Sequence, residues 1–146
     1  MKLISHRGNI NGKNSLFENH PPHIQTLISS GIDVEVDVWV QKNGFYLGHD
    51  DPQYKIDTAF LIKNCNFLWC HAKSLSSLNA MLNLNVLNCF WHDKDEFTLT
   101  SKGYIWQAHK RDICGKSVIV DNSFNSFSRK YETSPFAICS DFLPAI

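Results

Sequence analysis

Residues 33–40 (DVEVDVWV) decide the fold of this chain, because they combine the composition of a buried strand with two carboxylates. Side chains alternate between the two faces of a strand, so Glu35 and Asp37 share one face and the valines at even positions share the other. The valine face belongs to a core. Two like charges on the opposite face repel, and each resists losing its water unless a positive group compensates it. That face is therefore either open to solvent or holds a cation.

The composition is that of an ordinary soluble globular protein with one domain, residues 1–146. Hydrophobic residues make up 43% of the chain and charged residues 19%, which are usual proportions for such a domain. The 14 basic and 14 acidic residues cancel, which argues against a nucleic-acid partner held mainly by charge. No apolar run approaches the ~20 residues needed to span a membrane.

The cysteines and the N-terminus both favour a cytoplasmic protein. The five cysteines are odd in number, show no CxxC pairing and mostly fall within apolar runs, so we expect reduced core thiols rather than a disulfide or zinc framework. The polar motif HRG, a candidate for active-site residues, begins only a few residues after Met1, which leaves no room for a cleavable signal peptide.

Short strand-like runs recur along the chain, with turns or helices between them. The expected strands cover residues 2–6, 32–40, 66–73, 85–92, 103–108, 117–122 and 136–142, with an extended piece over 45–51. One helix is expected over residues 22–30, begun by Pro-Pro and ended by Gly31. A second is expected over residues 74–84, with Ser74 as its cap.

Apolar strands that alternate with helices are typical of an α/β fold with a mostly parallel sheet. We expect a reduced (β/α)8 TIM-type barrel, in which several helices are shortened or replaced by loops, particularly after Trp106. A full barrel usually needs about 250 residues, so the 146 residues of this chain require such trimming. An open α/β sheet is the alternative.

Polar residues gather where the expected strands end. In a parallel α/β fold the carboxyl ends of the strands form the edge at which ligands bind. The polar residues at these ends are His6 and Arg7, Glu35 and Asp37, His49 and Asp50, His71 and Lys73, and Asp141.

The order and spacing of these residues resemble the glycerophosphodiester phosphodiesterase family, whose barrel fold is shared by sphingomyelinase-D-like enzymes. The resemblance rests on HRG at 6–8, EN at 18–19, EVDV at 35–38, NG at 43–44 and HD at 49–50. Coverage is thinner beyond residue 50. LWCHAK at 68–73 and CSDFLP at 139–144 are similar to later strands of the family.

The resemblance implies a role for each residue that matches the motifs. His6 and His49 would be the acid/base pair. We assign His6 as base and His49 as acid, and the sequence leaves the reverse assignment open. Glu35 and Asp37 would bind a divalent cation, Mg²⁺ or Ca²⁺. Arg7 would hold the phosphate of a small glycerophosphodiester.

Four further residues complete the candidate site. Lys73 matches a family lysine that would also hold the phosphate, whereas His71 stands where the family has a glutamate. As a third metal ligand, His71 offers nitrogen, a donor better suited to Mn²⁺ or Zn²⁺ than to Ca²⁺. Glu18 and Asp141 are expected to support the site rather than to bind the metal.

The implied activity is hydrolysis of a phosphodiester, and its chemistry is reasonable on physical grounds. Attack on an anionic diester needs its charge neutralised by a metal and by cationic side chains. A neighbouring hydroxyl of the glycerol can attack phosphorus intramolecularly while one histidine removes its proton and the other protonates the leaving alcohol. Water can then open the cyclic phosphate. An enzyme that excludes this water is a lyase.

Two other functions stay open. A barrel with the cation site but without turnover would bind phosphorylated headgroups. A different metallohydrolase, such as an amidohydrolase-like barrel, normally carries H-x-H on its first strand, and ISHRG does not. The oligomeric state is not readable from the sequence.

Other polar or aromatic residues carry weaker signals. His92 and Asp93 follow a strand and either line the pocket or belong to an ordinary loop. Trp106 is expected in the core rather than against a substrate. The basic run His109, Lys110 and Arg111 is typical of a solvated loop.

Overall fold

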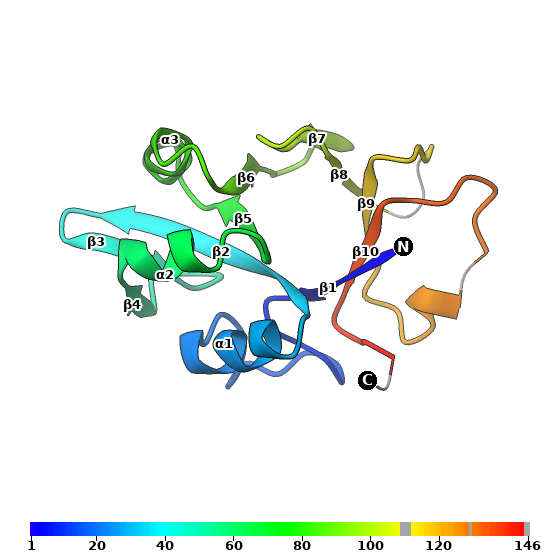
Figure 1. The fold of residues 1–146 in the computed structure, drawn as a ribbon, viewed down its shortest axis with the longest axis horizontal. Helices are drawn as coiled ribbons and strands as arrows, with labels where there is room; N and C mark the ends of the chain where they lie inside the picture. Colours follow the sequence, from blue (N-terminus) through cyan, green and yellow to red (C-terminus); the bar gives the residue numbers. More distant parts are fainter. Residues whose placement is uncertain (109–111, 129, 145–146) are drawn as a thin grey trace.

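A computed structural model describes residues 1–108, 112–128 and 130–144 of the chain (Figure 1). The basic run at 109–111 therefore lies outside the described residues. Ten strands form one sheet. They are β1 (Lys2–His6), β2 (Asp33–Gln41), β3 (Gly44–Leu47), β4 (Tyr54–Ile56), β5 (Leu68–Ala72), β6 (Asn88–Trp91), β7 (Phe97–Leu99), β8 (Ile105–Ala108), β9 (Ser117–Val120) and β10 (Ala137–Ser140).

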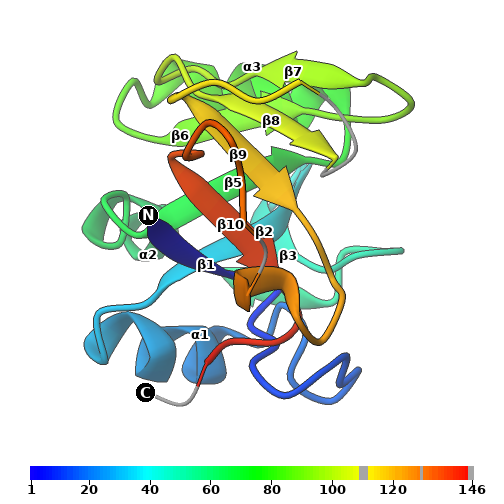
Figure 2. The same ribbon diagram turned by 90° about the vertical axis from the view of Figure 1, so that its right-hand side faces the viewer.

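Seven of the strands run parallel and follow one another around a curl. Strand β2 pairs with β1 on one side and with β5 on the other. From β1 the parallel pairing continues through β10 and β9 to β8, and Figure 2 shows these four strands side by side. From β5 it continues to β6. The carboxyl ends of all seven strands thus meet at one mouth of the curl.

The expected (β/α)8 barrel is wrong. The sheet is a ten-stranded mixed sheet curled into a half-barrel, with β3, β4 and β7 antiparallel to their neighbours. Within the described part of the chain, strand β6 pairs only with β5, so the ring of parallel strands is not closed there. The described residues contain only three α-helices, all before β6. A chain of 146 residues is too short to build both a closed ring of eight strands and its outer ring of helices.

The three helices cover the convex face of one half of the sheet (Figure 1). They are α1 (Pro21–Ser29), α2 (Thr58–Lys63) and α3 (Leu75–Asn83). The Ser74 side chain accepts a hydrogen bond from the backbone N–H of Ser77 and caps α3, as its sequence predicts. Loops and a 3-10 helix at Ser126–Ser128 connect the strands after β8 in the described residues.

The alternation of side chains along the strands produces two cores. On the convex face, the valines of β2 pack beneath the helices together with Cys70 and Cys89. On the concave face, Ile4, Trp69, Phe90, Trp106 and Val118 belong to a second cluster that fills the interior of the curl. Trp106 is therefore a core residue, as expected. Both faces of β2 are buried, unlike those of a strand at the surface.

The positions of the expected strands and of two helices agree with the structure to within a few residues, but three elements were missed. Strand β4, helix α2 and strand β7 had no counterpart in the sequence patterns.

All five cysteines are free, and three of them are buried. The expectation of core thiols is wrong for Cys114, which is exposed. No helix among the described residues is long and apolar enough to cross a membrane.

The interior cluster gives a test of the fold. Ile4 is fully buried in it, so Ile4→Ala should lower the free energy of unfolding by about 2–5 kcal/mol through lost burial and a new cavity. Leu75→Ala is the matched control, because Leu75 is 77% exposed and should change stability by less than about 0.5 kcal/mol. Urea denaturation measures both. Equal stability of the two variants would contradict the described core.

Candidate functional site

The carboxylates of β2 are buried inside the mouth of the half-barrel. Glu35 is 2% exposed and Asp37 is fully buried. Because burial penalises ionised groups strongly, positive partners must compensate them. The face of β2 that carries Glu35 and Asp37 is therefore not open to solvent, and the alternative, that positive groups or a cation lie against it, remains.

Glu35, Asp37 and His71 form a group that could hold a metal ion. Each offers one ligand atom, and these atoms all lie within 4.8 Å of one another. The parallel pairing of β2 with β5 places Asp37 directly beside His71. His71 Nδ1 lies 3.1 Å from Asp37 Oδ1 and 3.8 Å from Glu35 Oε1. Two carboxylates and one imidazole are a donor set that divalent transition metals accept.

The hydrogen bond made by the second nitrogen of His71 determines the tautomer of the neutral ring. Nε2 lies 3.0 Å from the carbonyl oxygen of His92, and a carbonyl only accepts, so Nε2 must carry a proton. The ring also stacks flat on Phe90, with 5.4 Å between centroids. In neutral His71 the lone pair of Nδ1 then points toward the carboxylates, the arrangement of a metal-bound histidine. Otherwise Nδ1 is protonated and the imidazolium itself is the cation.

The HRG segment turns sharply and brings two donors of Arg7 to the carboxylates. Arg7 has a φ of 56°, a left-handed conformation that is costly for a residue with a side chain. In this turn its backbone N–H donates to Glu35 Oε2 at 3.2 Å. Its Nε lies 3.2 Å from Asp37 Oδ2 as an ion pair without the angle of a hydrogen bond. The strained backbone conformation of Arg7 is therefore what places its two donors on the carboxylates.

The two carboxylates differ in how well they are compensated. Burial alone would raise the pKa of Asp37, but the hydrogen bond from His71 and the charges of Arg7, His71 and Lys73 hold this pKa well below its usual value. Burial and the charge of Asp37 raise the pKa of Glu35. Glu35 is therefore the carboxylate that gains most from an additional cation.

His6 is held by a network from the other side of the mouth. Its Nδ1 lies 2.8 Å from Asp141 Oδ1, and its Nε2 lies 3.9 Å from Glu35 Oε2. Burial opposes the charged form of the ring, but the hydrogen bond to Asp141 and the charge of Glu35 outweigh it and raise the pKa of His6. The Asn9 amide donates to both Asp141 and Glu18. Asp141 and Glu18 thus lie beside the site, in contact with His6, Asn9 and Arg7.

Lys73 joins the site, whereas His49 stands apart from it. Lys73 Nζ lies 3.5 Å from Asp37 Oδ1. The His49 side chain is 37% exposed and pairs with the neighbouring Asp50, with Nδ1 2.7 Å from Oδ1. Among the described residues, none of the other candidate site residues contacts the His49 ring. The structure therefore brings together all the predicted site residues except His49.

A pocket of about 280 Å³ opens above the carboxylates. His6, Arg7, Glu35 and His71 line it. His92, Gln107, Ala108 and Val120, whose contribution the sequence left open or did not indicate, line it as well, and so does Trp106, which was expected in the core alone. Of the two possibilities for His92, lining the pocket is correct.

Three asparagines of the site were missed. The Asn19 amide donates to Asp37 Oδ2 and accepts from the Asp37 backbone N–H, both at 2.9 Å. Asn9 bridges the two supporting carboxylates. Asn122 Oδ1 accepts from the Asp141 backbone N–H at 3.1 Å. Asn19 belongs to the EN motif and could have been found from it, whereas nothing in the sequence distinguishes Asn9 or Asn122 from ordinary loop residues.

Comparisons with protein-family models, with curated proteins and with solved structures returned no match for this chain. The resemblance to the phosphodiesterase family therefore rests on the quoted motifs alone, and the site is interpreted from its own geometry.

The opposite pKa directions of the two carboxylates predict opposite effects of neutralising them. In EDTA at pH 7, Asp37→Asn should lower the free energy of unfolding by about 3 kcal/mol or more, because it leaves buried cations unpaired. Glu35→Gln, its matched control, should leave stability unchanged or raise it, because the ionised form of Glu35 is disfavoured.

The pH dependence of Glu35→Gln follows from the same shift. A raised folded-state pKa of a carboxyl contributes stability at low pH that is lost as the pH rises through that pKa. The gain from Glu35→Gln should therefore shrink between pH 7 and pH 5, as measured by urea denaturation. A gain that grows on acidification would show that the ionised form of Glu35 is favoured instead.

Proposed function

We propose that the protein is a metal-dependent phosphodiesterase that cleaves a small glycerophosphodiester at the mouth of the half-barrel. One observation carries this proposal, the balance of charge in the site. Four carboxylates meet an arginine and a lysine, and the remaining negative charge is balanced by protonation of the histidines or of Glu35, or by one divalent cation. The carboxylates are Glu18, Glu35, Asp37 and Asp141, the cations are Arg7 and Lys73, and the histidines are His6 and His71.

The two carboxylates and one imidazole of the site favour a metal ion that binds nitrogen as well as oxygen ligands. Glu35, Asp37 and His71 would hold it, and His92 orients His71 through its carbonyl group. Imidazole favours Mn²⁺ or Zn²⁺ over Ca²⁺ and Mg²⁺. When bound, such a cation neutralises charge on a phosphate and polarises it toward attack.

The remaining residues supply binding and proton transfer. Arg7 and Lys73 attract the anionic diester, although both also contact Asp37. The Asp141 carboxylate accepts the Nδ1–H of His6, so Nε2 of neutral His6 is free to take a proton from an attacking hydroxyl. An adjacent hydroxyl of the glycerol reaches phosphorus at high effective concentration. In this scheme His6 is the base.

Protonation of the leaving alcohol is assigned to His49. Its Nδ1 faces Asp50, so in the protonated ring the N–H at Nε2 is left to donate to the leaving alcohol. The loop that carries it continues from β3, and the Gly48 backbone N–H donates to the Asp37 carbonyl at 3.1 Å. His49 is thus joined to the strand that bears the carboxylates, although its ring lies outside the cluster.

A second candidate is a protein that binds phosphorylated headgroups without turnover. The position of His71 favours it, because an imidazolium 3.1 Å from Asp37 Oδ1 supplies a positive charge without a metal. Arg7 and Lys73 would then be the phosphate ligands. Activity and its sensitivity to chelation separate the two candidates.

Phosphorus NMR on a panel of glycerophosphodiesters tests the activity. We expect turnover with Mn²⁺ that stops in EDTA, and a loss of at least about 100-fold in rate for His6→Ala and for His49→Ala. A linear phosphate product indicates a hydrolase and a cyclic one a lyase. Leu75→Ala, at an exposed position outside the candidate site, is the control. Ligand binding without turnover under any of these conditions would favour the headgroup-binding protein.

The metal preference tests the role assigned to His71. Competition between Mn²⁺ and Mg²⁺, followed by Mn²⁺ EPR, should favour Mn²⁺ in the native protein. His71→Glu exchanges nitrogen for oxygen and should reduce this preference by about tenfold or more. An unchanged preference would mean that His71 is not a ligand, and no Mn²⁺ binding by the native protein would remove the metal site from the proposal.

A further inference from the structure

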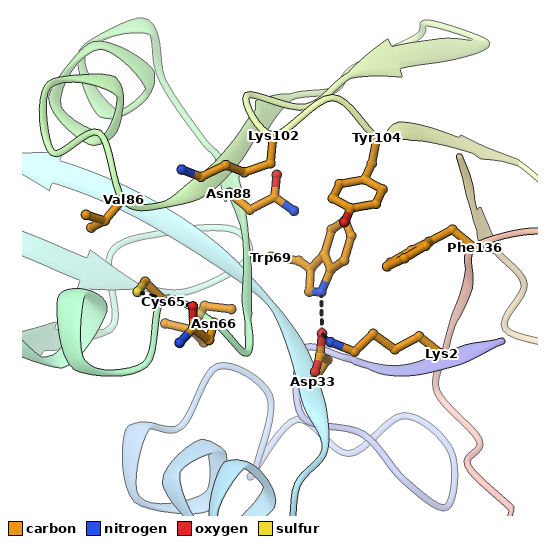
Figure 3. Close-up of a pocket in the computed structure, with 11 residues that line it drawn as sticks. Lys2, Asp33, Cys65, Asn66, Trp69, Val86, Asn88, Lys102, Tyr104 and Phe136 are labelled. Carbon is orange, nitrogen blue, oxygen red and sulfur yellow. Dashed lines mark hydrogen bonds and ion pairs between the residues drawn. The ribbon is translucent and has the colours of Figure 1, made fainter. Parts of the chain in front are cut away.

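The half-barrel has a second pocket, of about 420 Å³, at the mouth opposite the candidate site (Figure 3). It lies where β1, β2, β5 and β6 begin, and residues from each of these strands line it. The volume is within the usual range for small-molecule sites, roughly 300–1,000 Å³. The interior cluster that contains Ile4 and Phe90 lies between the two mouths. This pocket is therefore independent of the proposed phosphodiesterase site.

The acidic residue of this pocket, Asp33, already has an ion-pair partner and a hydrogen-bond donor within the protein. Asp33 is 2% exposed. Its Oδ2 pairs with Lys2 Nζ at 2.8 Å and accepts a hydrogen bond from the Trp69 indole N–H at 2.9 Å, and Figure 3 shows these groups together at one end of the pocket. Asp33 therefore contributes no uncompensated negative charge, and it fixes the orientation of the Trp69 ring.

Asn88 is the polar residue of the pocket that the fold does not satisfy. It is only 7% exposed, and its Oδ1 is buried without a hydrogen-bond partner. An unpaired buried acceptor lowers stability, whereas an apolar side chain of similar size at this position would not. A ligand that pairs with the amide would satisfy this acceptor.

The rest of the lining contains aromatic rings and Lys102, besides Cys65, Asn66, Leu68 and Val86. Trp69 meets Tyr104 at 5.1 Å between ring centroids, and Tyr104 meets Phe136 at 4.3 Å. Lys102 Nζ donates to the Asn85 carbonyl at 3.1 Å, which leaves further N–H groups of the ammonium for a ligand. With Lys2 and Asp33 cancelling, the pocket carries one net positive charge.

We propose that this pocket binds a small anionic ligand with a planar ring that bears an amino group beside a ring nitrogen, as in an adenine nucleoside monophosphate. An asparagine amide can pair with both the amino group and the ring nitrogen of adenine. Aromatic side chains stack on such rings, and Lys102 supplies the cation for the phosphate. The aromatic wall, the unpaired amide and the free positive charge thus each match one part of the ligand.

The test uses the full chain in EDTA and titrates adenosine monophosphate, adenosine and inorganic phosphate. The indole N–H signal of Trp69 in ¹H–¹⁵N NMR reports on the pocket, and that of Trp39, which donates to the Gly48 carbonyl, is the internal control. We expect a saturable shift of the Trp69 signal with adenosine monophosphate, and binding at least about tenfold weaker with adenosine or phosphate alone.

Two variants test the assigned contacts. Asn88→Leu should weaken the binding of adenosine monophosphate by about tenfold or more while raising the thermal stability of the free protein, because it removes an unpaired buried acceptor. Lys102→Met should weaken binding to a similar extent, and Lys94→Met, at an exposed lysine outside the pocket, should not.

Three results would overturn the proposal: no saturable shift of the Trp69 signal at millimolar nucleotide, native affinity in Lys102→Met, or equal affinity for all three probes. Lys102→Met changes a side chain at the rim, so this arm holds even if Asn88→Leu does not fold. Loss of phosphodiesterase activity in His6→Ala has no bearing on these results.

Discussion

The burial of Glu35 and Asp37 on one face of β2 is the constraint on which the rest of the structure depends. Two adjacent carboxylates cannot leave water without compensation, and positive groups from two other segments, the HRG turn and the end of β5, converge on them. The strained turn at Arg7 is explained by this requirement, because it directs a guanidinium and a backbone N–H to the carboxylates. The compensation is uneven, however, and Asp37 receives most of it.

Much of the local structure could be predicted, because buried strands and helix caps have strong sequence signals. The alternation in residues 33–40 indicated which side chains share a face, and the register of β2 with β5 brings His71 to Asp37. Closure of the sheet could not be predicted, because alternation is the same in an open and a closed sheet. Strands β4 and β7 are too short for a periodic signal. His49 could not be placed, since motif spacing does not fix the direction of a loop side chain.

The negative charge of the buried carboxylates can be compensated in two ways, by protonation of His71 or by a bound metal ion. His71 donates from Nε2 to a backbone carbonyl, so a proton and a metal ion held by this group would compete for Nδ1. Metal ligands must be deprotonated, and metal binding therefore releases protons. A carboxylate at this position would add a negative charge that protonation at neutral pH could not remove. Imidazole in its place lets the site remain folded and neutralised without the ion.

The inward side chains of β2 also bear on how the sheet assembles. Asp33, Glu35 and Asp37 alternate with valines that pack beneath the helices. A slip of one residue in the pairing of β2 would exchange the two faces, placing three carboxylates in the apolar layer and the valines among cationic groups. Such a misaligned sheet has no means of neutralising its buried charge. The residues that form the two mouths of the half-barrel thereby exclude the wrong register during folding.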